Sequence, residues 1–169
     1  GAAKVYAIDV GKGILHWKLR QDRRVVVMEK TNARFVERLP EPINLVTIDT
    51  SFISLKALLP AVKDWLTTPG QVIALVKPQF EAGHAQATRG EGVIRDPAIH
   101  RQVLGEVLHF AQSQGFALYG LAPSPLHGPK GNLEFLAWLG LPANYPQYPP
   151  ISDLEQAIQA CLEQASHPE

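Results

Sequence analysis

Two charged side chains lie where predicted strands end, and their chemistry suits a catalytic site. Lys77 follows the apolar run 73–76, and Pro78 prevents that strand from continuing. Asp49 follows the apolar run 45–48 in the same manner. Because ligands of open α/β sheets bind outside the carboxyl ends of the strands, a lysine and a carboxylate at these positions are candidates for chemistry.

Glu134 is the third member of this group. It lies in the apolar run 133–139, where an acid is costly unless it is paired. A buried lysine between two carboxylates can be a structural ion pair, which is the interpretation that Asp49, Lys77 and Glu134 alone favour. The catalytic alternative is that a lysine with a lowered pKa takes a proton from an alcohol while the acids hold its ammonium and the substrate.

Two further polar residues follow strands nearer the start of the chain. Asp9 ends the run 4–9 before a turn containing two glycines, and Asn32 follows the run 24–28. An acid in the first position can bind two ribose hydroxyls, and an asparagine after the next strand can bind an adenine edge. Asp9 alone is equally well explained as a helix cap or a turn residue, and Asn32 alone is better explained as a turn residue.

The elements that must position these residues alternate between strands and helices. A Pro60 inside the helical pattern 51–65 leaves open whether that helix kinks there or begins there. The last two strands have only a turn between them and are expected to pair antiparallel. The pattern predicts an α/β, Rossmann-like, doubly wound and mostly parallel sheet with one antiparallel strand. The expected strands are 4–9, 24–28, 45–48, 71–76, 116–122 and 133–139, and the other expected helices are one through Leu15 and Leu19, one from Asp96 to Gly115, and one in the tail.

Proline and glycine residues mark the expected boundaries in the rest of the chain. Pro69 and Gly70 are expected to end an element before the lysine strand, and 81–96 to form a long loop beside the site. Residues 1–141 are then the main domain, 142–150 a Pro-rich linker, and 151–169 an amphipathic tail that packs on the domain. The tail is expected to open with a capping box, Ser152 to Glu155.

Composition limits the class of protein. The chain has 169 residues, of which 46% are hydrophobic and 19% charged, and this suits one globular domain. It has no long apolar segment, no recognisable signal peptide and a single cysteine, so we expect a soluble cytoplasmic protein without a membrane partner. The first 40 residues hold nine Lys or Arg against four acids. Such asymmetry points weakly to a polyanionic partner, although a solvated face is the more common explanation.

Six segments taken together resemble the methyltransferase domain of the hemolysin TlyA family, one of the FtsJ-like ribosomal RNA 2′-O-methyltransferases. This resemblance implies a methyltransferase fold, S-adenosylmethionine as methyl donor, and ribosomal RNA or a ribosomal subunit as partner. It covers roughly residues 1 to 140, and the set is specific although any one segment could recur elsewhere. The segments are 4–11, 31–34, 48–55, 74–83, 92–97 and 128–135.

The resemblance also implies roles for individual residues. Asp49, Lys77 and Glu134 match three members of the family's Lys-Asp-Lys-Glu catalytic set. The matching cofactor contacts are Asp9, Val10, Asn32, Ala33 and Asp49. Candidate RNA contacts are Lys12, Lys18, Arg20, Arg89 and Lys130, and no metal site is expected.

Some of the family's features have no counterpart here. These are the first catalytic lysine, the first strand with its glycine-rich loop, and an S4-type RNA-binding domain. The chain is therefore expected to be incomplete at its N-terminus and to show a gap between the strands that end at Asp9 and Asp49. That gap should be about two strand spacings, roughly 9–10 Å, across.

Two other functions remain open. A nucleotide-dependent oxidoreductase would use a similar fold, but its Gly-x-Gly-x-x-Gly phosphate-binding loop is not present. A non-catalytic RNA-binding module would retain the fold without methyl transfer. Its binding to RNA would weaken steeply with salt.

Overall fold

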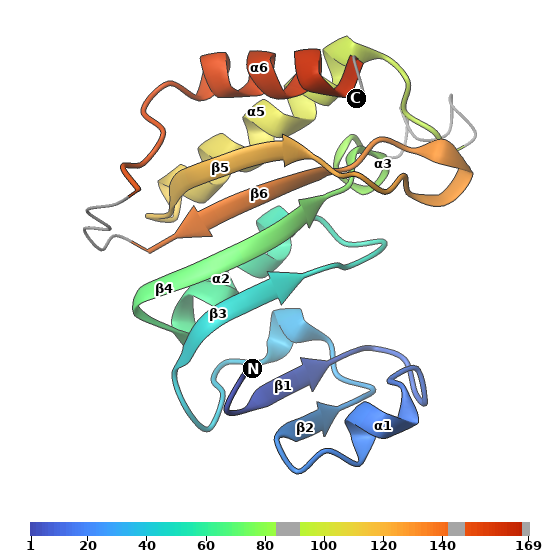
Figure 1. Cartoon of the computed structure of the whole chain (residues 1–169), viewed down its shortest axis with the longest axis vertical. Helices are drawn as coiled ribbons and strands as arrows, with labels where there is room; N and C mark the ends of the chain where they lie inside the picture. Colours follow the sequence, from blue (N-terminus) through green and yellow to red (C-terminus); the bar gives the residue numbers. More distant parts are fainter. Residues whose placement is uncertain (84–91, 142–147, 167–169) are drawn as a thin grey trace.

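The chain forms two β-sheets joined by connecting segments, as Figure 1 shows. The computed structural model describes residues 1–83, 92–141 and 148–166. Within these residues one sheet has the strand order β1-β2 and the other has the order β3-β4-β6-β5. Strands and helices alternate along the chain as the sequence predicts.

The two-stranded sheet is small and parallel. It pairs β1 (Val5–Ile8) with β2 (Val25–Met28) in register. The helix α1 (Trp17–Arg20) between them is a single turn without a buried residue, so the longer helix predicted through Leu15 and Leu19 is wrong in extent. An amphipathic pattern stabilises a helix only where its apolar face packs, and here Leu19 is 49% exposed.

The four-stranded sheet confirms the prediction of one reversed strand. β3 (Ile43–Ile48) and β4 (Leu66–Val76) pair in parallel. β6 (Phe135–Gly140) runs antiparallel to both β4 and β5 (Ala117–Pro123), and it lies between them. Figure 1 shows that β1, β3 and β4 point the same way, so their carboxyl ends share one side of the molecule.

The start of β4 differs from the prediction. Pro69 and Gly70 were expected to end an element, yet β4 continues through them. The ladder with β3 shifts register between Ile43 and Leu45, and the carbonyl of Gly70 accepts a hydrogen bond from the Leu141 N–H at 2.9 Å. A register shift lets the strand keep pairing although a proline lacks its own N–H donor.

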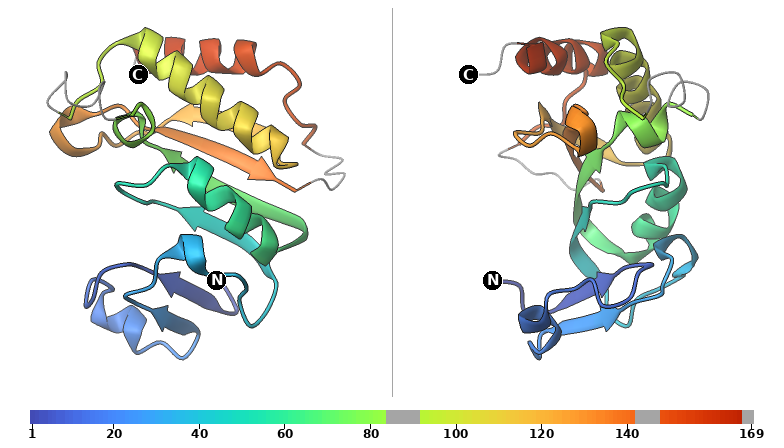
Figure 2. Two further views of the ribbon diagram at one scale, coloured as in Figure 1. Left: turned by 180° about the vertical axis from the view of Figure 1, so that it is seen from behind. Right: turned by 90° about the vertical axis from the view of Figure 1, so that its right-hand side faces the viewer.

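The helices that cover the four-stranded sheet supply a large share of the core. Figure 2 shows α2 (Leu55–Trp65) and α5 (Pro97–Ser113) on the same side of this sheet. Pro60 lies inside α2, which begins at Leu55 after the N-cap Ser54, so the helix does not start at the proline. Their buried residues include Leu58, Leu59, Val62, Val103, Leu104, Val107 and Leu108.

The tail folds onto the same core, as expected. Its helix α6 (Leu154–Ser166) packs against α5 and β5 and buries Ile158 and Cys161. The predicted capping box is wrong in detail, because Asp153 rather than Ser152 caps the helix. The Asp153 carboxylate accepts a hydrogen bond from the Gln156 N–H at 2.9 Å.

A groove separates the two sheets between β1 and β3. Its volume is about 870 Å³, and it is lined by both strands together with Leu58, Val62 and Trp65 of α2. β1 pairs with β2 and β3 with β4, so the groove lies between the two strands that were expected to flank a gap. The segment between the two sheets bonds to both of them. Its Glu41 forms an ion pair with Lys4, which precedes β1, and its Val36 carbonyl accepts a 2.8 Å bond from the Trp65 indole of α2.

Candidate functional site

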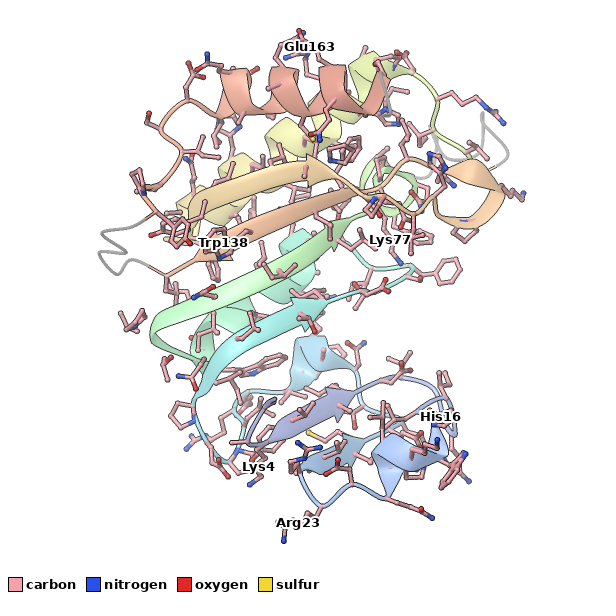
Figure 3. All side chains as sticks on the ribbon, in the orientation of Figure 1. Lys4, His16, Arg23, Lys77, Trp138 and Glu163 are labelled. Carbon is pink, nitrogen blue, oxygen red and sulfur yellow. The ribbon has the colours of Figure 1, made fainter. Side chains whose placement is uncertain are left out.

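Lys77 and Asp49 meet at the carboxyl ends of neighbouring parallel strands. Asp49 directly follows β3 and Lys77 directly follows β4, and the Lys77 Nζ lies 2.6 Å from the Asp49 Oδ1. The lysine side chain is 11% exposed and the aspartate side chain 75% exposed. Figure 3 shows Lys77 on the same side of the molecule as His16, which follows β1. A largely covered ammonium is therefore held by a carboxylate that faces solvent.

The helical turn α3 (Pro78–Glu81) fixes the backbone that follows Lys77. Pro78 occupies the first turn, as it favours. The Glu81 carboxylate accepts hydrogen bonds from the Ser54 Oγ at 2.6 Å and from the Leu55 N–H at 2.7 Å. An acid at a helix N-terminus satisfies free N–H groups and interacts favourably with the helix dipole. Glu81 thus ties the lysine segment to the start of α2.

Glu134 lies beside this site and is buried. Its side chain belongs to a residue only 5% exposed, and its Oε1 accepts a hydrogen bond from the Gln79 Nε2 at 2.8 Å. Val76 pairs with Phe135 in the antiparallel ladder, so continuing the register by one residue places Glu134 opposite Lys77. The direct partner of the Glu134 carboxylate is thus an amide, whereas Asp49 takes the lysine.

Phe52 is an exposed aromatic residue next to Lys77 that the sequence analysis missed. It is 90% exposed and has a φ of 63°, which is uncommon for a bulky residue. Its ring lies 4.8 Å from that of Phe80, and the Lys77 Nζ lies 6.0 Å from the Phe80 ring. The sequence signal that could have identified Phe52 is an aromatic residue three positions after Asp49, in the segment that follows a strand end.

The predicted cofactor contacts lie at the ends of β1, β2 and β3. Asp9 accepts a hydrogen bond from the Gly11 N–H at 2.7 Å, and Asn32 accepts one from the Arg34 N–H at 3.0 Å. Both therefore also serve the turns that follow them. Val10 is 70% exposed, whereas Ala33 and Asp49 line the groove between β1 and β3.

Three predicted RNA contacts gather around α1 on the two-stranded sheet. The Lys18 ammonium lies 5.7 Å from the Trp17 ring, and Arg20 forms an ion pair with Glu29. Lys12 lies in the turn before them and is exposed. Exposed Trp17 beside cations is a combination that suits a nucleic acid surface.

The other two predicted RNA contacts lie elsewhere. Lys130 is in the short 3₁₀ turn η2 (Pro129–Gly131), with a φ of 58°, shortly before Glu134. Arg89 lies outside the described residues. Among the residues that the structure describes, no helix has the length and apolar character needed to span a membrane.

Two buried groups near the core have shifted pKa values. Burial lowers the pKa of His100, whose ring bonds to the Ile94 carbonyl at 3.0 Å and contacts the edge of Phe135. Burial also raises the pKa of the Cys161 thiol to about 11. The cysteine therefore remains a thiol near neutral pH and acts as a packing residue in α6.

The model of the FtsJ-like methyltransferase family matches residues 1–141. The chain belongs to the FtsJ-like methyltransferase family. Membership agrees with the mixed sheet and with a site at the carboxyl ends of its parallel strands. It confirms the predicted fold.

Two curated relatives are similar to the chain in sequence. The chain is 46% identical over 148 residues to "Putative rRNA methyltransferase YqxC" of Bacillus subtilis, covering 84% of this chain and 51% of that protein. It is 45% identical over 141 residues to "16S/23S rRNA (cytidine-2'-O)-methyltransferase TlyA" of Mycobacterium tuberculosis, covering 82% and 52%. The chain thus spans about half the length of these curated relatives.

A solved structure shows the same arrangement. The crystal structure of a "putative hemolysin" from Lactococcus lactis is 41% identical and superposes with a TM-score of 0.85. The match covers 99% of this chain and 78% of that one. The predicted resemblance to the TlyA group is therefore confirmed by relatives in both sequence and structure.

Proposed function

We propose that the chain carries the catalytic site of an S-adenosylmethionine-dependent methyltransferase that acts on the ribose 2′-hydroxyl of ribosomal RNA. The observation that carries this proposal is the covered Lys77 ammonium paired with Asp49 at the carboxyl ends of β4 and β3, in a chain of the FtsJ-like family. The names of its TlyA relatives supply the substrate class.

Lys77 is the group that acts on the attacking hydroxyl. In its neutral form the amine would accept the hydroxyl proton while the ribose oxygen bonds to the methyl carbon, the carbon–sulfur bond of the donor breaks and the neutral thioether leaves; Asp49 would stabilise the resulting ammonium. Glu134 lies opposite Lys77 in the strand register and adds a second negative charge at this end of the sheet. General acid–base assistance of this kind contributes about 10²- to 10⁴-fold to a rate.

The donor is proposed to occupy the end of the groove between β1 and β3. S-adenosylmethionine, when bound, supplies the methyl group as an electrophile. Ala33 and Asp49 line the groove, which supports a ligand between the two strand ends. Asp9 is proposed to accept bonds from the ribose hydroxyls, and Asn32 to contact the adenine edge.

RNA is proposed to approach over Phe52. An exposed ring beside the lysine offers a surface on which a base can stack, and such stacking is tolerant of base identity. The cations Lys12, Lys18, Arg20, Arg89 and Lys130 are proposed to contact phosphates, which would make binding salt-dependent.

Variants of Lys77 in the full-length protein test the proposal. Lys77→Ala should slow single-turnover transfer of labelled methyl to ribosomal RNA by roughly 10²-fold or more, while calorimetry shows nearly unchanged donor binding. Lys77→Arg should not restore the rate, because a guanidinium does not lose its proton near neutral pH. Lys56→Ala, which breaks a surface ion pair with Glu106, is the control. A nearly full rate for Lys77→Arg would make Lys77 a charged positioner and place the base elsewhere.

A further inference from the structure

Gln79 holds the carboxylate of Glu134 in a buried environment. Gln79 is 8% exposed and Glu134 is 5% exposed, and the bond between the Gln79 Nε2 and the Glu134 Oε1 is 2.8 Å long. A neutral amide donor orients a carboxylate without neutralising its charge, which a lysine or arginine would do. Gln79 therefore fixes one oxygen of Glu134 and leaves its negative charge in place.

Gly128 provides the space that this carboxylate occupies. A Cβ added at Gly128 would lie 2.1 Å from the Glu134 Oε1, which is far inside a van der Waals contact. The φ of Gly128 is −70°, a conformation that any residue adopts, so backbone freedom does not explain the glycine. The close approach of Glu134 does explain it.

Asn132 fixes the turn that contains Gly128. Its side chain accepts a bond from the Ile94 N–H at 3.0 Å and donates to the Pro129 carbonyl at 2.9 Å. Its own carbonyl accepts a bond from the Gly128 N–H at 2.9 Å. Because Asn132 is only 2% exposed, these bonds are shielded from water. The turn beside Glu134 is therefore anchored on both sides.

The bond to Glu134 is what Gln79 contributes at this place. Its Oε1 is buried and has no hydrogen-bond partner in the part of the chain that the structure describes. An unpaired buried acceptor is destabilising, and an apolar side chain of similar length would fill the same space without it. The feature that an apolar side chain would lose is the bond to Glu134.

We propose that Gln79 is a positioning residue for methyl transfer, which holds the Glu134 carboxylate just before β6 and opposite Lys77, while Gly128 leaves the room for it. This inference rests on the proposed function, in which Glu134 acts in the reaction. The amide acts only through that carboxylate. Its loss should therefore change the rate of the chemical step and leave the binding of donor and RNA unchanged.

Three variants of the full-length protein, compared with the wild type, test this role: Gln79→Met, Glu134→Ala and the double variant. Gln79→Met should lower kcat for methyl transfer to ribosomal RNA by roughly 10- to 100-fold, the range for a hydrogen bond to a charged group, with both KM values unchanged. Glu134→Ala should lower kcat at least as much. In the Glu134→Ala background, Gln79→Met should have no further effect.

A second pair of variants reaches the same carboxylate by another route. Gly128→Ala should lower kcat in the same manner, because its Cβ would displace Glu134. Gly105→Ala is the matched control, since a Cβ there has nothing within 4 Å. This pair decides the matter if Gln79→Met does not fold.

The outcomes separate the two proposals. If Gln79→Met lowered kcat equally in the presence and absence of Glu134, the positioning role would be overturned. A full rate for Gln79→Met together with an inactive Glu134→Ala would also overturn it. In both cases the proposed function would remain. A full rate for Glu134→Ala would overturn the positioning role together with the part of Glu134 in the proposed function.

Discussion

The two sheets differ in how completely their side chains are covered. No residue before Ile48 is buried, whereas most of the buried core of the described residues lies in the four-stranded sheet and in the helices α2, α5 and α6. β1 exposes 41% of Val5 and β3 exposes 52% of Leu45, and these two strands flank the groove. The four-stranded part is therefore a packed scaffold, whereas the two-stranded part leaves its side chains largely uncovered.

This difference matches a division of labour in the proposed site. Lys77, Asp49 and Glu134 stand on the packed sheet, where rigid elements hold side chains within the tolerance that catalysis requires. Asp9 and Asn32, proposed for the donor, stand on the two-stranded sheet. Donor binding should therefore be more sensitive than the catalytic geometry to what occupies the groove.

The largest expected effect concerns the groove itself. Strand edges with unpaired amides are costly when buried and prone to association when open. Residues 1–169 alone are therefore expected to bind S-adenosylmethionine weakly, to transfer no methyl groups, and to associate. Analytical ultracentrifugation with calorimetry measures both properties. A monodisperse monomer that binds the donor tightly and stoichiometrically would contradict the claim that the two sheets differ in how completely they are covered.

Matched leucine substitutions quantify the difference in packing. Leu59→Ala, at a residue with 0% exposure in α2, should lower the free energy of unfolding by about 2–5 kcal/mol. Leu45→Ala, at a residue 52% exposed on β3, should change it by about 0.5 kcal/mol or less. Denaturant unfolding measures both. Similar losses at the two positions would mean that the groove side of β3 is covered in solution.

Asp9 tests the donor side of the comparison. In the full-length protein, Asp9→Ala should weaken S-adenosylmethionine binding by about 1–3 kcal/mol, because ribose hydroxyls lose their acceptor. Asp22→Ala, which removes a partly exposed partner of Arg24 in the turn before β2, is the control. Calorimetric titration gives the dissociation constants. Equal constants for Asp9→Ala and the wild type would leave Asp9 as a turn residue that bonds Gly11.

The smallest effect is a pH dependence that arises from buried His100 in α5, one of the helices that cover the packed sheet. Burial lowers the pKa of folded His100 below its usual 6.5, so the unfolded chain takes up a proton first as the pH falls. The free energy of unfolding therefore keeps the full contribution of neutral His100 above pH 6.5. Below pH 6.5 it should fall by at most about 1.4 kcal/mol per pH unit until folded His100 titrates. His100→Gln should remove this dependence in denaturant unfolding at several pH values. The exposed control His109→Gln should retain it.

Strand ends were the part of the structure that the sequence predicted best. Apolar runs that stop at Asp49 and Lys77 located two strand ends, because a charge and a following proline end a buried strand unambiguously. The antiparallel pairing of β5 and β6 followed from the short turn between them. Where a local signal competes with tertiary pairing, as at Pro69 in β4, the pairing prevails.

Contacts between distant segments could not be read from the sequence. Gln79 and Glu134 are 55 positions apart, and neither residue type indicates that an amide rather than Lys77 takes that carboxylate. Phe52 reads as an ordinary core aromatic until its exposure is known. The length of α1 likewise depends on tertiary packing, which periodicity does not report.

The position of the transferred methyl group tests the proposed reaction most directly. Full-length protein, labelled S-adenosylmethionine and ribosomal subunits would be incubated, and the RNA analysed by nucleoside mass spectrometry and alkaline hydrolysis. The account predicts a ribose 2′-O-methyl nucleoside whose adjoining phosphodiester resists alkali, absent with Lys77→Ala. A methyl group on a base, or no transfer by the wild type, would contradict it.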